Sequence, residues 1–104
     1  MEKLITKTEI LKQLKSNEKQ LLDYGVKEIG LFGSFLTNDV NSNSDIDLLV
    51  DIKKESKTFK NFMSLNYFLE KLFGRKVDLV TKQSLSPYIG PHILNSVEYV
   101  ALSN

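Results

Sequence analysis

Short apolar runs in the chain have the length and composition of β-strands. Residues 26–32 (VKEIGLF) end in an apolar run, and residues 45–52 (DIDLLVDI) set acids between aliphatic side chains. Residues 75–80 (RKVDLV) repeat that pattern, and residues 98–101 (EYVA) form a last, shorter run. Runs of roughly four to eight residues that are rich in Val, Ile and Leu and bounded by glycine or polar residues predict strands.

The N-terminal segment has apolar residues at helical spacing. Thr6 and Glu9 fit a capping box, in which a threonine caps the helix and a glutamate three residues later reaches back to it. The apolar stripe weakens at Asn17, which has the character of a second cap, and Gly25 is suited to end the segment. These features predict one kinked helix or two short ones over residues 7–24.

A longer helix is predicted between the second and third strands. Thr58 is its expected N-cap, Phe73 its last residue and Gly74 its stop. Its large apolar residues cover more than one face, which indicates either deep burial or a second surface for a partner. Shorter helices are predicted near residues 34–36 and 91–95.

The order of these elements predicts an α+β fold, an α/β sandwich in which helices flank a small mixed β-sheet. The chain has 104 residues, of which 41% are hydrophobic, and no linker, repeat or low-complexity segment interrupts it. We therefore expect a single domain over residues 1–104 with a core of modest size.

Composition narrows the classes of function. Fourteen basic and 13 acidic residues leave a formal net charge of +1, which argues against a strongly electrostatic nucleic-acid or membrane binder. The chain has no cysteine, so thiol catalysis, disulfides and zinc–thiolate sites are excluded. The N-terminus lacks the continuous apolar core of a signal peptide, and no apolar run approaches membrane-spanning length. A cytoplasmic protein is therefore expected.

Three aspartates are the candidate metal ligands and catalytic groups. Asp45 and Asp47 alternate along the second predicted strand, so their side chains point to the same face about 7 Å apart at Cα. Asp78 lies within the third predicted strand and joins them if the two strands are neighbours. Clustered carboxylates repel unless a cation lies between them, and Mg²⁺ prefers such ligands. The alternative is structural: a solvated strand face for the first two acids and an exposed edge-strand position for the third.

Gly33 and Ser34 are the candidate phosphate-binding residues, and ten residues separate them from Asp45. Glycine lets the backbone approach a ligand closely, and the serine hydroxyl with helix-start N–H groups can bind phosphate oxygens. The structural alternative, a turn followed by a helix cap, is compatible with that role. Lys82, just after the third strand, is a further candidate for phosphate contact, and Tyr99 is expected at the edge of the core.

Together these residues carry a resemblance to a known family. The segment GSFLTNDVNSNSDIDLLV, at residues 33–50, resembles the Gly-Ser-x10-Asp-x-Asp signature of the DNA polymerase beta-like nucleotidyltransferase superfamily. With its short length and the VDLV sequence around Asp78, the chain is similar over residues 26–100 to the minimal nucleotidyltransferases of bacteria and archaea. The resemblance implies the nucleotidyltransferase fold.

The resemblance also implies a role for each candidate residue, with ATP as the nucleotide donor. Gly33 and Ser34 would contact the nucleotide phosphates. Asp45 and Asp47 would bind Mg²⁺, and Asp78 would be the third carboxylate. Three carboxylates in one cleft could hold two Mg²⁺ ions, which clamp the attacking and leaving oxygens of a displacement at phosphorus.

One departure from the family pattern concerns the nucleotide. Family members commonly carry Ala-Arg-Gly just after Gly-Ser-Phe, whereas this chain has Leu36, Thr37 and Asn38. The basic residue that would balance the charge of the triphosphate is therefore missing. Losing one such charge-assisted contact costs about 1.5–3 kcal/mol of binding.

The leading hypothesis is an Mg²⁺-dependent nucleotidyltransferase that moves AMP from ATP to a protein hydroxyl. Proteins similar to this chain are often encoded with a HEPN-domain partner and act as the antitoxin of a toxin–antitoxin pair. Some of them transfer AMP to a tyrosine of the HEPN ribonuclease, and the resemblance implies such a partner here. Because the domain is too small to enclose both substrates, we expect the acceptor protein to complete the site in a homo- or hetero-oligomer.

Two alternatives stay open. A non-catalytic antitoxin would neutralise its partner by contact alone, in keeping with the missing basic residue and the apolar excess of the helix at residues 58–73. A small-molecule nucleotidyltransferase of the aminoglycoside-modifying type would need a helical substrate-binding domain from another subunit. Nucleic acid as a direct substrate is disfavoured by the near-neutral charge and by the lack of room for a template channel.

Overall fold

A computed structural model of the chain describes residues 6–33, 45–84 and 96–102. The helices predicted near residues 34–36 and 91–95 lie outside these ranges. In chain order, the described elements are α1 (Lys7–Ser16), α2 (Glu18–Asp23), β1 (Val26–Phe32), β2 (Ile46–Ile52), a 3-10 turn (Lys54–Ser56), α4 (Phe59–Phe73), β3 (Val77–Thr81), a second 3-10 turn (Lys82–Ser84) and β4 (Glu98–Val100).

The described strands form one mixed sheet in the order β3-β2-β1-β4. Strand β1 pairs antiparallel with both β2 and β4. Strands β2 and β3 pair in parallel. Helix α4, which joins them in the chain, returns the chain to the end of the sheet where β2 begins, so both strands run in the same direction. The predicted α+β fold with a small mixed sheet is confirmed.

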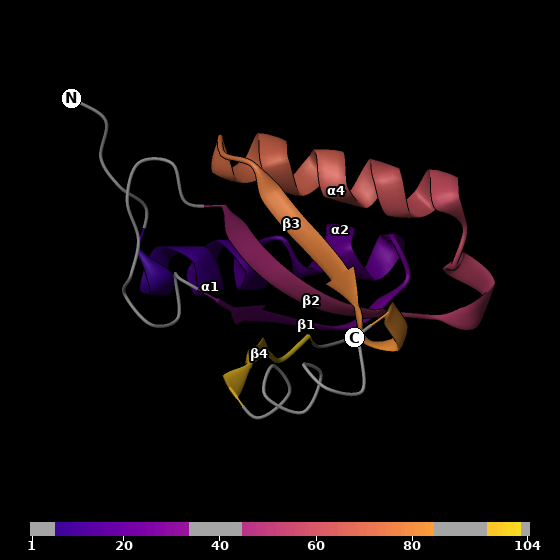
Figure 1. Cartoon of the computed structure of the whole chain (residues 1–104), viewed down its shortest axis with the longest axis horizontal. Helices are drawn as coiled ribbons and strands as arrows, with labels where there is room; N and C mark the ends of the chain where they lie inside the picture. The colour runs from indigo at the N-terminus through magenta and orange to yellow at the C-terminus, as the bar shows by residue number, and fades with distance from the viewer. Residues whose placement is uncertain (1–5, 34–44, 85–95, 103–104) are drawn as a thin grey trace.

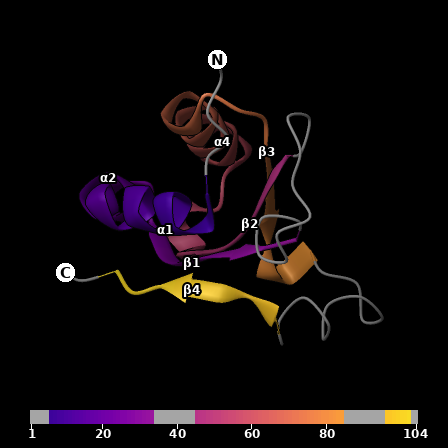
Figure 2. The same ribbon diagram turned by 90° about the vertical axis from the view of Figure 1, so that its left-hand side faces the viewer.

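Helices α1, α2 and α4 lie on the same side of the sheet (Figures 1 and 2). The core forms between this helical layer and the sheet face that it covers, and its buried members come from both layers: Ile10, Leu14, Leu21, Val26, Ile29, Leu31, Ile46, Leu48, Val50, Ile52, Leu65, Leu69, Val77, Leu79 and Val100. Aliphatic side chains from both layers stabilise the fold by removing apolar surface from water. No helix within the described ranges combines the length and apolar content needed to cross a membrane.

The N-terminal helical segment is two helices. The predicted cap at its start is confirmed, because Thr6 Oγ1 accepts a hydrogen bond from the N–H of Glu9 (3.2 Å). Asn17 is the N-cap residue of α2, as predicted, but its side chain makes no capping hydrogen bond to that helix. Asn17 Nδ2 instead donates to the carbonyl of Gln13 (2.8 Å), so this side chain satisfies the end of α1 rather than the start of α2. Gly25, with φ of 83°, ends the segment as predicted.

Helix α4 has the predicted bounds. Thr58 Oγ1 accepts a hydrogen bond from the N–H of Asn61 (3.1 Å), and Gly74 adopts the left-handed conformation with φ of 62° at the other end. Leu65 and Leu69 are fully buried against the sheet. One face of the helix is buried, as the first interpretation expects, and another is exposed, so that a surface for a partner stays a prediction.

Strand β3 differs slightly from the prediction, beginning at Val77 instead of residue 75 and continuing to Thr81. The N–H of Arg75 donates to the carbonyl of Glu70, so Arg75 is still hydrogen-bonded to the last turn of α4. The first parallel partners are Ile46 and Val77, and pairing continues from there.

Candidate active site on the open face of the sheet

Strand β2 sorts its side chains onto two faces. Ile46, Leu48 and Val50 are fully buried beneath the helices. Asp47 and Asp51 alternate with them and lie on the opposite face, which the described helices leave uncovered. We call this opposite face the open face. Leu49 lies between the two acids on this face and is fully buried, so acids alternate with aliphatic residues at the two ends of β2 but not in its middle.

Asp47 of β2 and Asp78 of β3 are register partners in the parallel pair. Partners in a sheet have side chains on the same face, and neighbouring strands lie about 4.8 Å apart. Asp45 directly precedes β2 and is two residues from Asp47. If the alternation of the strand is continued to Asp45, its side chain points to the same face as that of Asp47. The structure thus meets the condition set from the sequence, namely that the third strand lies beside the second.

The three acids differ in exposure. Asp78 is exposed, whereas Asp45 and Asp47 are partly buried. Asp45 and Asp78 have no ion pair or side-chain hydrogen bond within the part of the chain that the structure describes. In that part, no three acids or histidines are close enough together to hold a metal ion as they stand. The carboxylates therefore share one face without converging on a common point.

The chemistry of this donor set fits a hard divalent cation. Its members are carboxylates on adjacent strands, which repel one another at neutral pH and would gain from a cation placed between them. Oxygen ligands of this kind suit Mg²⁺, which needs only one or two carboxylates when substrate phosphates supply the rest. The residues present can therefore hold such an ion once the side chains turn toward it.

Gly33 brings the end of β1 against Asp47. Its φ is 78°, and a Cβ atom at this position would collide with the Asp47 carboxylate. Phe32 and Asp47 are also register partners. The predicted proximity of the Gly-Ser turn to the acids therefore holds for the glycine, and Ser34 lies outside the described residues.

A second cluster on the open face was not predicted. Lys82 Nζ lies 2.7 Å from Glu28 Oε1 and 5.0 Å from the centre of the Tyr99 ring. The hydrogen bond that Lys82 donates to the Glu28 carboxylate raises the pKa of Lys82 above its usual value of 10.5, outweighing the opposite effect of burial. The cluster joins three separate chain segments, so only knowledge of the strand register could have revealed it. Lys82, considered for phosphate contact, already holds a carboxylate.

Gly30 explains how β4 fits this face. A Cβ atom at Gly30 would meet the side chains of Val97 and Tyr99, which lie across it. Tyr99 is the register partner of Gly30, and its ring is partly exposed. The prediction that Tyr99 lies at the edge of the core is therefore wrong, because Tyr99 is 39% exposed on the open face and is not packed against the core cluster.

Comparison with known proteins assigns the family. The model of the nucleotidyltransferase domain family matches residues 7–100, a range that holds the sheet, its helices and the three acids. The chain belongs to the nucleotidyltransferase domain family. The enzyme class predicted from the Gly-Ser and Asp-x-Asp residues is confirmed at this level, and a nucleotide is the family's donor substrate.

Named relatives and solved structures agree with this assignment. Protein adenylyltransferase MntA of Thermococcus cleftensis is 40% identical over 98 residues, which is 93% of this chain and 98% of the relative. A solved structure described as a minimal nucleotidyltransferase has a TM-score of 0.69 at 27% identity, covering 85% of this chain and 93% of that one. A toxin–antitoxin structure with AMP-PNP has a TM-score of 0.64 at 22% identity, covering 85% and 75% of the two chains. At this identity, the last comparison supports the fold alone.

Proposed function

We propose that this chain is an Mg²⁺-dependent protein adenylyltransferase that moves AMP from ATP to a hydroxyl group of a partner protein. The observation that carries the proposal is the placement of Asp47 opposite Asp78, with Asp45 two residues from Asp47 and Gly33 against Asp47. The similarity to a named protein adenylyltransferase over nearly the whole chain supports the choice of a protein as acceptor.

Each acid has a distinct role in this proposal. Asp45 and Asp47 hold Mg²⁺, and Asp78 completes the ligand set. The metal supplies neutralisation of phosphate charge and orientation of the attacking and leaving oxygens. Asp78 is the most exposed of the three and faces the incoming acceptor, so it accepts the proton of the attacking hydroxyl.

The transfer is a single displacement at the α-phosphorus of ATP. The acceptor oxygen forms a bond to this phosphorus, the bond to the bridging oxygen of the β-phosphate breaks, and pyrophosphate leaves with the electron pair. Gly33 and Ser34 hold the phosphates of the leaving group through backbone N–H groups and the serine hydroxyl. The protein contributes positioning and charge, without a covalent enzyme intermediate.

The acceptor in this proposal is a tyrosine of a HEPN ribonuclease toxin encoded beside this chain, which then acts as the antitoxin. The resemblance to minimal nucleotidyltransferases motivates this acceptor. A structure of the same fold, solved as a toxin–antitoxin pair with AMP-PNP, shows that this fold occurs in such pairs.

The test is the intact mass of the partner after incubation with this chain, ATP and Mg²⁺. We expect a gain of one or more AMP units, which the variant Asp45→Asn/Asp47→Asn abolishes. The matched control is Asp23→Asn/Glu55→Gln, which removes two exposed acids that lie outside β2 and β3. Full transfer by the first variant, or equal loss in both, would contradict the assignment.

A contact-only antitoxin is the second candidate, and Thr37 is the observation that favours it. Arginine is common at this position in the family, and threonine cannot balance triphosphate charge. In this case the partner gains no mass, a stable complex forms, and the carboxylate variant neutralises the toxin at the same dose as the parent chain.

A further inference from the structure

Helix α4 exposes a row of large apolar side chains. Phe59 is 81% exposed, Met63 46% and Tyr67 68%. They are spaced four residues apart, so they form one stripe along the outside of the helix. Isolated exposed apolar residues are ordinary, but three in one row on one helix indicate a contact surface.

The charged residues that are exposed on this face are both lysines, and the acid beside them, Glu70, is partly buried. The exposed residues of α4 are Phe59, Lys60, Met63, Ser64, Tyr67 and Lys71, which we call the α4 outer face. Neither lysine has an ion pair within the described residues. The one acid of the helix, Glu70, is partly buried and accepts a hydrogen bond from the N–H of Val77 (3.1 Å). An occupant that complements this face is therefore apolar and acidic.

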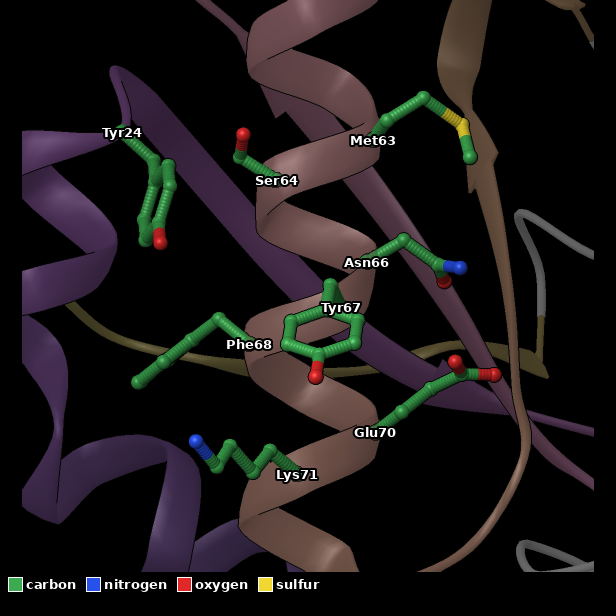
Figure 3. Close-up of a pocket in the computed structure, with 8 residues that line it drawn as sticks. All are labelled: Tyr24, Met63, Ser64, Asn66, Tyr67, Phe68, Glu70 and Lys71. Carbon is green, nitrogen blue, oxygen red and sulfur yellow. The ribbon is translucent and has the colours of Figure 1, made fainter.

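A hollow with a volume of about 640 Å³ lies on this face. Figure 3 shows the side chains that line it. Tyr24 of the α2–β1 turn borders it beside α4, and its ring lies 5.7 Å from that of Phe68. The rest of the lining comes from α4: Met63, Ser64, Asn66, Tyr67, Phe68, Glu70 and Lys71. A large side chain of a partner fits in such a hollow, as anchor residues do at protein interfaces.

The positive charge continues beyond the start of the helix. Lys53, Lys54 and Lys57 are exposed in the segment that leads from β2 to α4, and none has an ion pair within the described ranges. Glu55 is also exposed in this segment, so the segment has a positive net charge, of the same sign as the α4 outer face. Such a pattern steers an acidic partner toward this end of the helix.

The position of α4 relates this face to the acids. Strand β3 is an edge strand of the described sheet, and α4 packs beside it (Figure 1). Asp78 of β3 lies on the open face, so α4 and the acids lie on opposite sides of the sheet at this edge. A protein that docks on the α4 outer face reaches Asp78 by extending around α4 and the edge formed by β3.

We propose that the α4 outer face docks a helix of the acceptor protein, with an apolar stripe flanked by Asp or Glu. The inference rests on the proposed function, since it names where the acceptor binds. A second copy of this chain does not suit the face, because pairing it with itself opposes Lys60 and Lys71 with no exposed acid on either helix. An anionic membrane would match the charge but would not explain the hollow.

The test measures the affinity between this chain and the product of the adjacent gene. We expect Phe59→Ser/Tyr67→Ser and Lys60→Glu/Lys71→Glu each to raise Kd by about tenfold or more. The control Lys12→Glu/Lys19→Glu makes the same change in charge on exposed lysines of α1 and α2 that have no ion pair in the described part. It should leave Kd within about twofold. Circular dichroism and thermal melting verify that all three variants are folded.

Four outcomes would overturn the proposal. The first is that the parent chain forms no complex, and the second is that all variants bind the partner equally. The third is a homodimer in light scattering that the α4 variants dissociate without changing partner binding. The fourth is sedimentation with phosphatidylglycerol vesicles that the α4 variants abolish, again without changing partner binding. The variant Asp45→Asn/Asp47→Asn separates the two proposals, because docking predicts parental affinity for it. If the parent chain binds through α4 but transfers no AMP, the proposed function fails and the docking surface stands.

Discussion

The carboxylate of Asp47 occupies the space in which a Cβ atom on Gly33 would lie. The glycine therefore has two reasons to be glycine. Its φ of 78° is strained for any L-residue with a side chain, and its lack of a side chain lets the end of β1 close against the acid. The first reason concerns stability alone, while the second concerns where the carboxylate points.

Substitution Gly33→Ala separates these two effects. We expect a loss of about 1–2 kcal/mol in the free energy of unfolding from backbone strain. We also expect about 100-fold slower AMP transfer, since a displacement of about 1 Å in a catalytic group has a cost of this order. Chemical denaturation and the rate of mass gain in the partner measure the two quantities.

Gly74→Ala is the matched control. Gly74 has φ of 62°, but no atom lies within 4 Å of the Cβ position, so the substitution adds strain without a collision. It should destabilise the chain by about 1–2 kcal/mol and leave the transfer rate unchanged. Equal rates for the two variants would show that the contact between Gly33 and Asp47 has no part in the chemistry.

Substitution Asp78→Asn should change stability in opposite directions with and without metal. Asp47 and Asp78 are direct partners across β2 and β3, and like charges so placed are destabilising. Without divalent ions the variant should gain about 0.2–1 kcal/mol. With Mg²⁺ and a non-hydrolysable ATP analogue, the parent chain should become the more stable of the two, because only it retains the complete ligand set.

Thermal melting in EDTA and in Mg²⁺ with the analogue measures this reversal. The variant Asp23→Asn removes an exposed acid of α2 and should follow the parent chain under both conditions. A constant difference between the parent chain and Asp78→Asn, independent of metal, would argue against metal ligation by this residue.

Substitution Asn61→Ala should be among the most destabilising polar changes in α4. Its side-chain nitrogen donates to the carbonyls of Tyr24 (2.7 Å) and Ser56 (2.9 Å), and thereby connects α4 to the end of α2 and to the turn after β2. Two lost hydrogen bonds with partly buried acceptors cost about 2–3 kcal/mol. Asn17→Ala, which loses one exposed hydrogen bond, should cost about 1 kcal/mol in the same urea titration. Equal costs would contradict the connecting role.

The Lys82–Glu28 pair predicts a pH-dependent contribution to stability. Because the pKa of Lys82 is raised in the folded chain, the contribution is complete below about pH 10.5 and is lost as the pH rises through the folded value. Lys82→Met should cost about 0.5–1 kcal/mol at neutral pH, given that the pair is largely exposed. The difference from the parent chain should shrink above pH 10.5 in urea titrations, whereas Lys12→Met should have no effect at either pH. A difference in unfolding free energy that stays constant with pH would show that the charge interaction is not its cause.

The sequence predicted the elements well where local signals were strong. Helix α4 has Thr58 and Gly74 at its ends, and both carry out in the structure the capping that their residue types predict. Asn17 occupies the predicted cap position of α2, but its amide donates to the end of α1, because such a side chain can bond to either of two adjoining helices and the sequence does not distinguish them.

The candidate site was predictable only in part. Alternation placed Asp45 and Asp47 on one face, but their relation to Asp78 needed the strand order. The Lys82–Glu28–Tyr99 cluster could not be predicted, since register between distant segments decides it. Exposure of the α4 stripe likewise depends on which face the helix buries, and the apolar pattern of α4 allowed more than one answer.

Substitution Thr37→Arg tests whether the departure from the family pattern limits nucleotide binding. Residue 37 lies outside the described residues, so the prediction rests on the sequence resemblance and on charge. A guanidinium that reaches a phosphate contributes about 1.5–3 kcal/mol, which corresponds to about 10- to 100-fold tighter ATP binding in the presence of Mg²⁺. Isothermal titration calorimetry with the non-hydrolysable analogue measures the change. Thr8→Arg adds the same charge at an exposed position of α1 and should leave the affinity unchanged. Equal effects of the two substitutions would show that only net charge matters. No effect of Thr37→Arg would mean that other groups, from this chain or its partner, already balance the triphosphate.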